Sequence, residues 1–322
     1  MTEITTRRCG SGEQPSPMAD ERMLVFYLRN ARKKAREAAT AEALALLHDL
    51  DPRAPRGGPL SEVSGVLWIT VPDQHVETAA SRLPRLGYTE AVDLLVGEDA
   101  DGCRGTPTGR LTRWKRHTYE LVRLYEEDPA ALRARAPDRR LFLFETGDGQ
   151  VRAVQGYRGS NDPLTHRALP VPDARLLVNL VTQAGPGLLL DPFAGAGGIV
   201  LEALTSGWSV VSADIDPAVR HGLVEFGTRH VVADARRLPF GDGLVDAIAT
   251  EPVYDARVGE LVEEALGELH RVLRPGGRLA MLCAAWQAAG LRQRAEPLGL
   301  YPQLDTPVNR KGLDVVALVW RK

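Results

Sequence analysis

The residues best suited to chemistry in this chain are a glycine-rich loop and several acids that follow it. The stretch LLLDPFAGAGGIVLEAL, residues 188–204, has the pattern of a strand, a loop of small residues and an apolar-periodic helix. Glycine permits positive φ, and because it lacks a Cβ it lets the backbone approach a ligand closely at the mouth of a helix. The loop is therefore expected to bind a small polar molecule. Acids stand at the ends of apolar segments at Asp191, Asp214, Asp234 and Glu251.

Taken alone, the glycine loop fits three cofactors: NAD, FAD and S-adenosylmethionine. Asp214 ends the next apolar segment, where an acid can accept hydrogen bonds from ribose hydroxyls. The loop reads GAGG, and Val200 stands where a dinucleotide-binding loop needs a third small residue for close packing. Asp234 can accept a hydrogen bond from an adenine amino group, beside apolar walls at 238–240. These details favour S-adenosylmethionine.

The elements that must position these residues alternate between strand and helix. Continuous apolar strands separated by helices predict a parallel sheet covered on both faces. Ligands of such sheets lie at the carboxyl ends of the strands, so the glycine loop and the acids should share one edge. The expected fold is α/β, with a Rossmann-like, mostly parallel seven-stranded sheet and a smaller N-terminal α+β domain. Strands are expected at 188–191, 208–214, 229–234, 243–251, 278–284 and 313–320.

The motifs of this region resemble the class I S-adenosylmethionine-dependent methyltransferases. DPFAGAGG, ADIDP, VVADARRLPF and RVLRPGGRL occur in that order across residues 188–283. The resemblance implies that Gly195 and Gly197 lie against the methionine tail of the cofactor. It also implies that Asp214 holds the ribose and Asp234 the adenine. The full set of residues expected at the cofactor is Asp191, Phe193, Gly195, Gly197, Asp214, Ile215, Asp234 and Ala235.

A narrower resemblance points to the tRNA guanosine N2-methyltransferases that act on the guanosine at position ten. DPFAGAGGIVLEAL is similar to their DPFCGSGxxxIEA motif, and ARLLVNL at 174–180 resembles the ARALVNL helix before it. Asp173 is the expected N-cap of this helix. Arg175 and Asn179 could face the methionine end of the cofactor, although the polarity of a helix surface explains them nearly as well. The N-terminal half resembles the family more loosely, without a clear RNA-binding THUMP signature.

The tetrapeptide at the expected chemical site departs from the family. Its members use Asp or Asn followed by Pro-Pro-Tyr to accept both hydrogens of an amine and to stack on the base; here the sequence is Glu251-Pro252-Val253-Tyr254. One extra methylene moves a carboxylate by ~1.5 Å, and a misplacement of ~1 Å can cost about a hundredfold in rate. Either the backbone compensates for the longer side chain of Glu251, or the substrate differs from that of the family. Glu251, Pro252 and Tyr254 are the expected catalytic residues, and the alternative is a degenerate loop at a strand end.

The length of the chain predicts about two domains, and its composition is typical of an ordinary soluble protein. The chain has 322 residues, a net charge of −2 and 44% hydrophobic residues. The expected division is a disordered leader at 1–22, an α+β domain at 23–160 that presents the substrate, and the methyltransferase domain at 161–322. Neither half is basic, so a nucleic acid needs a local patch. The segment 104–117 carries several Lys or Arg residues and a Trp, and reads equally well as an RNA-contacting surface or a solvated linker.

Cysteine and hydropathy patterns favour a cytoplasmic protein. No apolar run reaches the ~18 residues that a membrane span needs, and no two cysteines form a CxxC pair, which fits a reducing compartment. The histidines His221, His230 and His270 have no metal-ligand spacing, so no metal is expected.

The leading hypothesis is a methyltransferase that moves the methyl group of S-adenosylmethionine to an amine nitrogen of RNA, at N2 of a guanosine in tRNA. A second hypothesis keeps the enzyme and makes the acceptor a small molecule or a protein. A third is a non-catalytic RNA-binding protein with a vestigial cofactor fold, and a nicotinamide-dependent oxidoreductase is a distant fourth.

Overall fold

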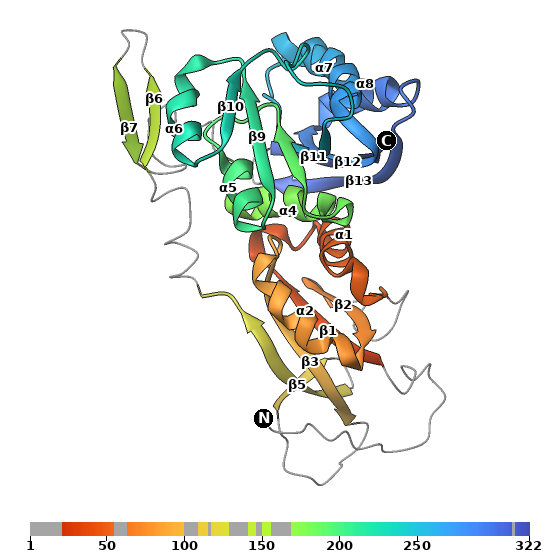
Figure 1. Cartoon of the computed structure of the whole chain (residues 1–322). Helices are drawn as coiled ribbons and strands as arrows, with labels where there is room; N and C mark the ends of the chain where they lie inside the picture. Colours follow the sequence, from red (N-terminus) through yellow and green to blue (C-terminus); the bar gives the residue numbers. More distant parts are fainter. Residues whose placement is uncertain are drawn as a thin grey trace.

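The computed structural model describes residues 21–54, 63–99, 109–114, 117–128, 141–145, 150–155, 169–310 and 313–322 (Figure 1). These residues form a five-stranded sheet, a two-stranded hairpin and a seven-stranded sheet. The expected fold class is confirmed: a mostly parallel α/β sheet is joined to an N-terminal antiparallel unit. Nearly all of the expected leader and the expected boundary at residue 160 lie outside the described residues, although strand β1 already begins at Glu21.

The N-terminal sheet is antiparallel throughout, with strand order β2-β1-β3-β5-β4. Helix α2 ends before Pro84, and a 3-10 turn at Leu83–Arg85 follows it. One apolar face of the sheet packs on α1 and α2. The bounds are β1 (Glu21–Leu28), α1 (Arg36–Leu46), β2 (Val66–Pro72), α2 (Val76–Arg82), β3 (Thr89–Asp99), β4 (Arg110–Trp114) and β5 (His117–Glu126).

The seven-stranded sheet has the order β10-β9-β8-β11-β12-β14-β13. Its first five strands are parallel, and β14 runs antiparallel to both β12 and β13. The bounds are β8 (Leu188–Asp191), β9 (Ser209–Asp214), β10 (Arg229–Val232), β11 (Val245–Thr250), β12 (Leu273–Ala284), β13 (Tyr301–Arg310) and β14 (Leu313–Arg321). The pattern of the sequence did not reveal β13, because two prolines and alternating polar residues interrupt its apolar positions.

Helices cover both faces of this sheet, which explains why its strands are continuously apolar. α7 and α8 share a core cluster with one face. α4 and α5 share a second, larger cluster with the other face, and that cluster continues without a break into α1 and the N-terminal sheet. The two sheets are therefore joined by a common hydrophobic core rather than by a linker alone. The bounds are α4 (Val171–Val181), α5 (Gly198–Thr205), α6 (Arg220–Glu225), α7 (Gly259–Val272) and α8 (Ala285–Ala295).

Three smaller features complete the fold. Strand β6 (Leu141–Glu145) pairs with β7 (Val151–Gln155) as a hairpin beside α6 in Figure 1, and residues 146–149 between them lie outside the described residues. Cys283 is fully buried, and burial raises the pKa of its thiol to about 12. Among the described residues, no helix combines the length and the apolar character needed to cross a bilayer.

Candidate functional site

The four sequence-predicted acids lie along one edge of the seven-stranded sheet. Asp191 and Asp214 end β8 and β9, while Asp234 and Glu251 follow β10 and β11. These four strands are neighbours and parallel, so their carboxyl ends meet at the same edge. The chain order reverses between β8 and β11, and such a reversal opens the crevice in which sheets of this kind bind ligands. The geometry predicted for the loop and the acids is confirmed.

The glycine loop closes tightly between β8 and α5. Gly195 has φ 50° and Gly197 has φ 86°, a left-handed conformation that disfavours any side chain. Gly197 is also the N-cap of α5, and a Cβ there would lie 2.5 Å from the ring of Phe226 and 2.8 Å from Leu223. The second glycine is thus needed for packing against α6 as well as for the turn.

Asp214 organises the loop through its carboxylate. Its Oδ2 accepts a hydrogen bond from the backbone N–H of Gly195 at 2.8 Å, and its Oδ1 accepts one from Asp216 at 2.9 Å. The side chain stays half-buried, and the next residue, Ile215, is 68% exposed. A carboxylate beside an uncovered apolar side chain fits a ribose with a ring next to it, which is the pattern that the nucleoside part of S-adenosylmethionine presents.

Asp234 is engaged by a surface ion pair. Its Oδ2 lies 2.7 Å from Nη2 of Arg236, and its Oδ1 accepts the backbone N–H of the same residue at 2.9 Å. Arg236 also contacts Glu264 at 3.1 Å. Exposed pairs of this kind are worth about 0–1 kcal/mol, so the guanidinium does not close the position to an adenine amino group. The adjacent Ala235 is buried.

Asp191 differs from the other acids because its side chain turns into the protein. It is 1% exposed and accepts hydrogen bonds from the hydroxyl of Thr250 at 2.9 Å and from the N–H of Phe193 at 3.3 Å. Burial raises the pKa of this carboxyl to about 7. The bond to Thr250 bridges β8 and β11 at the strand reversal, while the Phe193 side chain stays half-buried. The roles of Asp191 and Phe193 at the cofactor remain predictions.

The tetrapeptide at 251–254 holds its carboxylate through a single oxygen. The Tyr254 hydroxyl and Nη1 of Arg310 both donate to Oε1 of Glu251 in short hydrogen bonds. No described residue donates to Oε2. Burial raises the pKa of Glu251, although Arg310 and the Tyr254 hydrogen bond oppose the shift. Pro252 is buried, while the side chain of Val253 is mostly exposed.

Tyr254 is bound more tightly than a free stacking platform would be. Its hydroxyl donates to Glu251 and lies 3.4 Å from the carbonyl oxygen of Leu282, and its ring packs against the core. Burial places the pKa of this phenol well above its ordinary value, so it remains a donor. Stacking of Tyr254 on a substrate ring stays a prediction.

Sequence reasoning missed three residues that shape this loop. Gln287, buried on α8, donates from Nε2 to the Val253 carbonyl at 3.0 Å and fixes the loop from behind. Trp286 beside it is 50% exposed and packs on Gly259, where a Cβ would come within 2.7 Å of its ring. Arg310 reaches Glu251 from the unexpected strand β13. No local motif marks any of the three, since each is distant from the tetrapeptide in sequence.

The polar residues of α4 have structural partners rather than the suggested place at the cofactor. Asn179, 1% exposed, donates to Glu42 at 2.8 Å and to the carbonyl of Arg85 at 2.9 Å, both in the N-terminal domain. Arg175 contacts Glu202 at 3.0 Å and Glu127 at 3.5 Å. The suggestion that these two side chains face the methionine tail is therefore wrong, because Asn179 faces the N-terminal domain and Arg175 is held between Glu127 of that domain and Glu202 of α5.

The expectation that Asp173 caps α4 is also wrong. The helix begins at Val171, before the start that a cap at Asp173 would give, and its N-cap is Pro170, which makes no side-chain cap hydrogen bond. Asp173 instead accepts hydrogen bonds from Arg32 and from the Tyr88 hydroxyl at 2.8 Å. We call the buried and half-buried polar residues between α4 and the N-terminal domain the seam; its members are Arg32, Glu42, Tyr88, Glu127, Asp173, Arg175 and Asn179.

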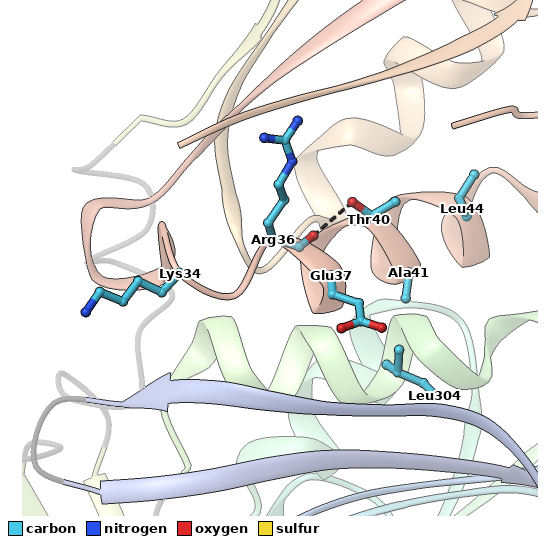
Figure 2. Close-up of a pocket in the computed structure, with 7 residues that line it drawn as sticks. All are labelled: Lys34, Arg36, Glu37, Thr40, Ala41, Leu44 and Leu304. Carbon is cyan, nitrogen blue, oxygen red and sulfur yellow. Dashed lines mark hydrogen bonds between the residues drawn. The ribbon is translucent and has the colours of Figure 1, made fainter. Parts of the chain in front are cut away.

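A groove of about 560 Å³ lies elsewhere, between α1 and β13 (Figure 2). Lys34, Arg36, Glu37 and Leu44 of the α1 side and Leu304 of β13 line it. Glu37 lies between the two elements and accepts a hydrogen bond from Thr306 of β13 at 2.8 Å. None of the acids at the carboxyl edge lines this groove, so it is separate from the candidate site.

The expected basic segment 104–117 is described only at 109–114 and 117. Within that part, Arg110 pairs with the buried Asp93 at 2.8 Å and its guanidinium lies 5.9 Å from the Tyr27 ring centre. Arg113 is exposed. The rest of the segment lies outside the described residues, so its role with RNA stays a prediction.

Comparison with known proteins agrees with this geometry. Residues 190–281 match the family described as "Methyltransferase domain". Over 116 residues the chain is 38% identical to a demethylmenaquinone methyltransferase of Thermus thermophilus, covering 34% of this chain and 52% of the relative. Over 122 residues it is 38% identical to a tRNA (guanine(10)-N2)-dimethyltransferase of Methanothermobacter thermautotrophicus, covering 34% and 36%. The chain thus spans about half or less of the length of these relatives.

The fold extends beyond that domain. The crystal structure of TrmN from Thermus thermophilus matches 93% of this chain and 99% of its own, with a TM-score of 0.52 at 19% identity. At this identity the likeness shows the fold alone, and it includes the N-terminal unit as well as the seven-stranded sheet. The glycine loop, the acids at the carboxyl edge and the family match together identify residues 190–281 as a methyltransferase domain of the class that uses S-adenosylmethionine.

Proposed function

We propose that the protein methylates an amine nitrogen of RNA, with N2 of a guanosine in tRNA as the acceptor. The observation that carries this proposal is the geometry of Glu251. Its Oε1 is held by two donors while Oε2 is left without a described partner, at the end of β11, whose neighbour β8 leads into the glycine loop. An acceptor oxygen fixed at the carboxyl edge suits an N–H group, whereas an anionic acceptor atom would be repelled by it.

The chain's residues have a simple task in such a transfer. The cofactor, when bound, supplies an electrophilic methyl group on a sulfonium, so positioning accounts for most of the catalysis. Glu251 Oε2 and the Pro252 carbonyl would accept the two amine hydrogens and direct the nitrogen lone pair toward the methyl carbon. As the C–N bond forms and the C–S bond breaks, the nitrogen must lose a proton. Glu251 can take it, because burial raises the pKa of its carboxyl and so makes the carboxylate a stronger base.

An RNA acceptor is supported by the motifs and by one relative. ARLLVNL and DPFAGAGGIVLEAL resemble the tRNA guanosine N2-methyltransferases, and one relative is named as a tRNA (guanine(10)-N2)-dimethyltransferase. The N-terminal domain and the basic segment 104–117 would present the RNA. The RNA would then meet the cofactor domain at the edge where Val253 and Trp286 are exposed.

The direct test uses tRNA with and without this protein. Nucleosides from tRNA of cells that carry or lack the gene are compared by mass spectrometry, and purified protein is incubated with labelled S-adenosylmethionine and the tRNA lacking the modification. We expect one methylated guanosine to disappear with the gene and to be restored in vitro. A protein that binds the cofactor but labels no tRNA pool contradicts the proposal.

A small-molecule acceptor is the second candidate, because another relative is named as a demethylmenaquinone methyltransferase and Glu-Pro-Val-Tyr departs from the tRNA family. The dependence on salt concentration distinguishes an RNA acceptor from a small-molecule acceptor. Binding of RNA weakens steeply between low and moderate salt as counterions are released, whereas turnover of an uncharged small molecule does not. A vestigial, non-catalytic site is the third candidate, and absence of S-adenosylmethionine binding in calorimetry would favour it.

A further inference from the structure

A continuous series of buried charged side chains runs from the candidate acceptor to the N-terminal domain. Arg310, 5% exposed, donates from Nη1 to Glu251 and lies 3.3 Å from Oδ2 of Asp173 through Nε. Its guanidinium thus bridges two carboxylates that come from β11 and α4. Because Arg presents a rigid planar fork of donors, holding one carboxylate fixes the direction in which it offers hydrogen bonds to the other.

The far end of the series is anchored in the N-terminal domain. Asp173 is fully buried, and its Oδ1 lies 2.7 Å from Nη2 of Arg32 and accepts the Tyr88 hydroxyl at 2.8 Å. Arg32 also lies over the Tyr88 ring, 5.3 Å from its centre. Arg32 follows β1 and Tyr88 precedes β3, so both are set by the N-terminal sheet.

Burial makes this arrangement sensitive to each member. A buried charge that loses its partner is costly, so the remaining groups move or change protonation rather than stay unpaired. At the catalytic end, a carboxylate displaced by ~1 Å can cost about a hundredfold in rate. The series therefore provides a physical route by which domain packing affects the acceptor.

We propose that Arg310 is a positioning residue that fixes the Glu251 carboxylate for the acceptor amine, and that the N-terminal domain holds Arg310 in turn through Asp173. The inference rests on the proposed role of Glu251 in methyl transfer to an amine. It gives the N-terminal domain a second task besides presenting the substrate: the domain completes the active site. The extra methylene of Glu251 is then matched by a partner that holds its carboxylate in place.

The charged groups around Glu251 fix the direction of the pH effect. Arg310 of β13 and the Tyr254 hydroxyl lower its pKa, while Asp173 of α4 raises it, and Asp191 of β8 is a further neighbouring acid. Removing the guanidinium must therefore raise the pKa of Glu251. Because the ionised carboxylate is the form that accepts the amine, the acid limb of the rate profile should move to higher pH.

The experiment compares variants of the whole chain in tRNA methylation and cofactor binding. Arg310→Met should lower kcat by about a hundredfold, leave the Kd for S-adenosylmethionine unchanged, and move the acid limb upward. Arg310→Lys, which keeps the charge but not the fork, should recover the position of the acid limb more than it recovers kcat. Tyr88→Phe removes one hydrogen bond to Asp173 and should lower kcat by about tenfold.

Tyr119→Phe is the matched control for the N-terminal half of the proposal. Tyr119 is a buried tyrosine of the same domain, and it packs in the cluster of Val25 and Trp68, whereas Tyr88 belongs to the core cluster that includes α4. The control should keep the wild-type kcat. If Tyr88→Phe behaves like Tyr119→Phe, the coupling to the N-terminal domain is overturned. If Arg310→Met keeps the wild-type kcat and pH profile, the positioning role is overturned.

A second measurement does not use activity as its readout, and it compares two Arg310 variants with the wild type rather than one. In protein labelled with ¹³C in glutamate carboxyls, the Glu251 resonance is assigned by its loss in Glu251→Gln and titrated in wild type, Arg310→Lys and Arg310→Met. A higher pKa in Arg310→Met supports the contact, and an unchanged pKa overturns it. If the wild-type protein methylates no tRNA but Arg310→Met still shows the higher pKa, only the proposed function is refuted.

Discussion

The carboxyl edge and the seam both concentrate polar residues, but they use them in opposite ways. At the edge, Asp214 and Asp234 are half-buried and are held mainly by backbone N–H groups or by an exposed Arg. In the seam, Asp173 and Asn179 are buried and satisfied by side chains of a second domain. Side chains that are anchored yet partly open can still bind a ligand, whereas buried and fully paired ones cannot.

The comparison teaches how to assign polar residues beside a cofactor motif. α4 immediately precedes the glycine loop in sequence, which made Arg175 and Asn179 candidates for the cofactor. Their partners Glu42, Arg85 and Glu127 show that the helix instead carries the domain contact. Substitutions in the seam should therefore reduce stability, and substitutions at the edge should reduce binding or rate. Arg310 and the seam residues that hold it, Asp173 and Tyr88, are the exception, because Arg310 touches both regions.

The largest expected effect comes from Asp191, which lies at the edge but is buried like a seam residue. Its folded pKa of about 7 exceeds its ordinary value, so the folded state binds the proton more tightly. The stability that this provides is complete at acid pH and is lost as the pH rises through 7. Relative to Asp191→Asn, wild-type protein should lose on the order of 4 kcal/mol of unfolding free energy between pH 4 and pH 8. Urea unfolding at both pH values measures this, and a constant difference between the two proteins contradicts it.

Glu251→Gln should lower kcat by about 10² to 10³-fold, as does loss of one directed hydrogen-bonding group in other active sites. The amide is the same size, but Arg310 and Tyr254 donate to Oε1 and so select its oxygen. The amide NH₂ must then face the substrate amine. Thermal stability should change little. Glu260→Gln, at an exposed position of the following helix, is the control and should retain full activity.

Asp214→Asn should raise the Kd for S-adenosylmethionine by about tenfold to a hundredfold, the equivalent of a charge-assisted hydrogen bond. Both carboxylate oxygens accept a backbone N–H, and an amide can satisfy only one of them. Calorimetry measures the change. Asp242→Asn, an exposed acid paired with Arg271, should bind the cofactor as wild type does. Equal affinities for all three proteins would place the cofactor elsewhere.

The smallest expected effect belongs to the seam. Asn179→Ala removes the donor to Glu42 and should cost about 1–3 kcal/mol of unfolding free energy. The Kd for S-adenosylmethionine should not change, since the side chain faces the N-terminal domain. Asn30→Ala, at an exposed position, should leave stability near that of wild type. If Asn179→Ala binds the cofactor more weakly but keeps its stability, the side chain of Asn179 contributes to the cofactor site after all.

Much of the fold and of the carboxyl edge could be predicted because the governing rules are local. A glycine loop between a strand and a helix, and acids at strand ends, depend on residues close together in sequence. Parallel strands then bring those ends to one edge whatever their helices contain. The strand β13 escaped prediction because its prolines and polar residues obscure its apolar positions. Arg310, at its end, was lost with it.

The sequence by itself determined the parallel sheet, the glycine loop, the order of the acids and the class of cofactor. Only the tertiary structure decided which polar residues remain open to a ligand. In the sequence, Asp173, Arg175 and Asn179 have the pattern of surface residues of a helix, but in the fold the N-terminal domain packs against them. The sequence also suggests that the longer side chain of Glu251 misplaces its carboxylate, but in the fold this carboxylate is held by Arg310, which is 59 residues away in the chain. Partners so distant leave no local pattern, because their approach depends on how two sheets pack around one shared core.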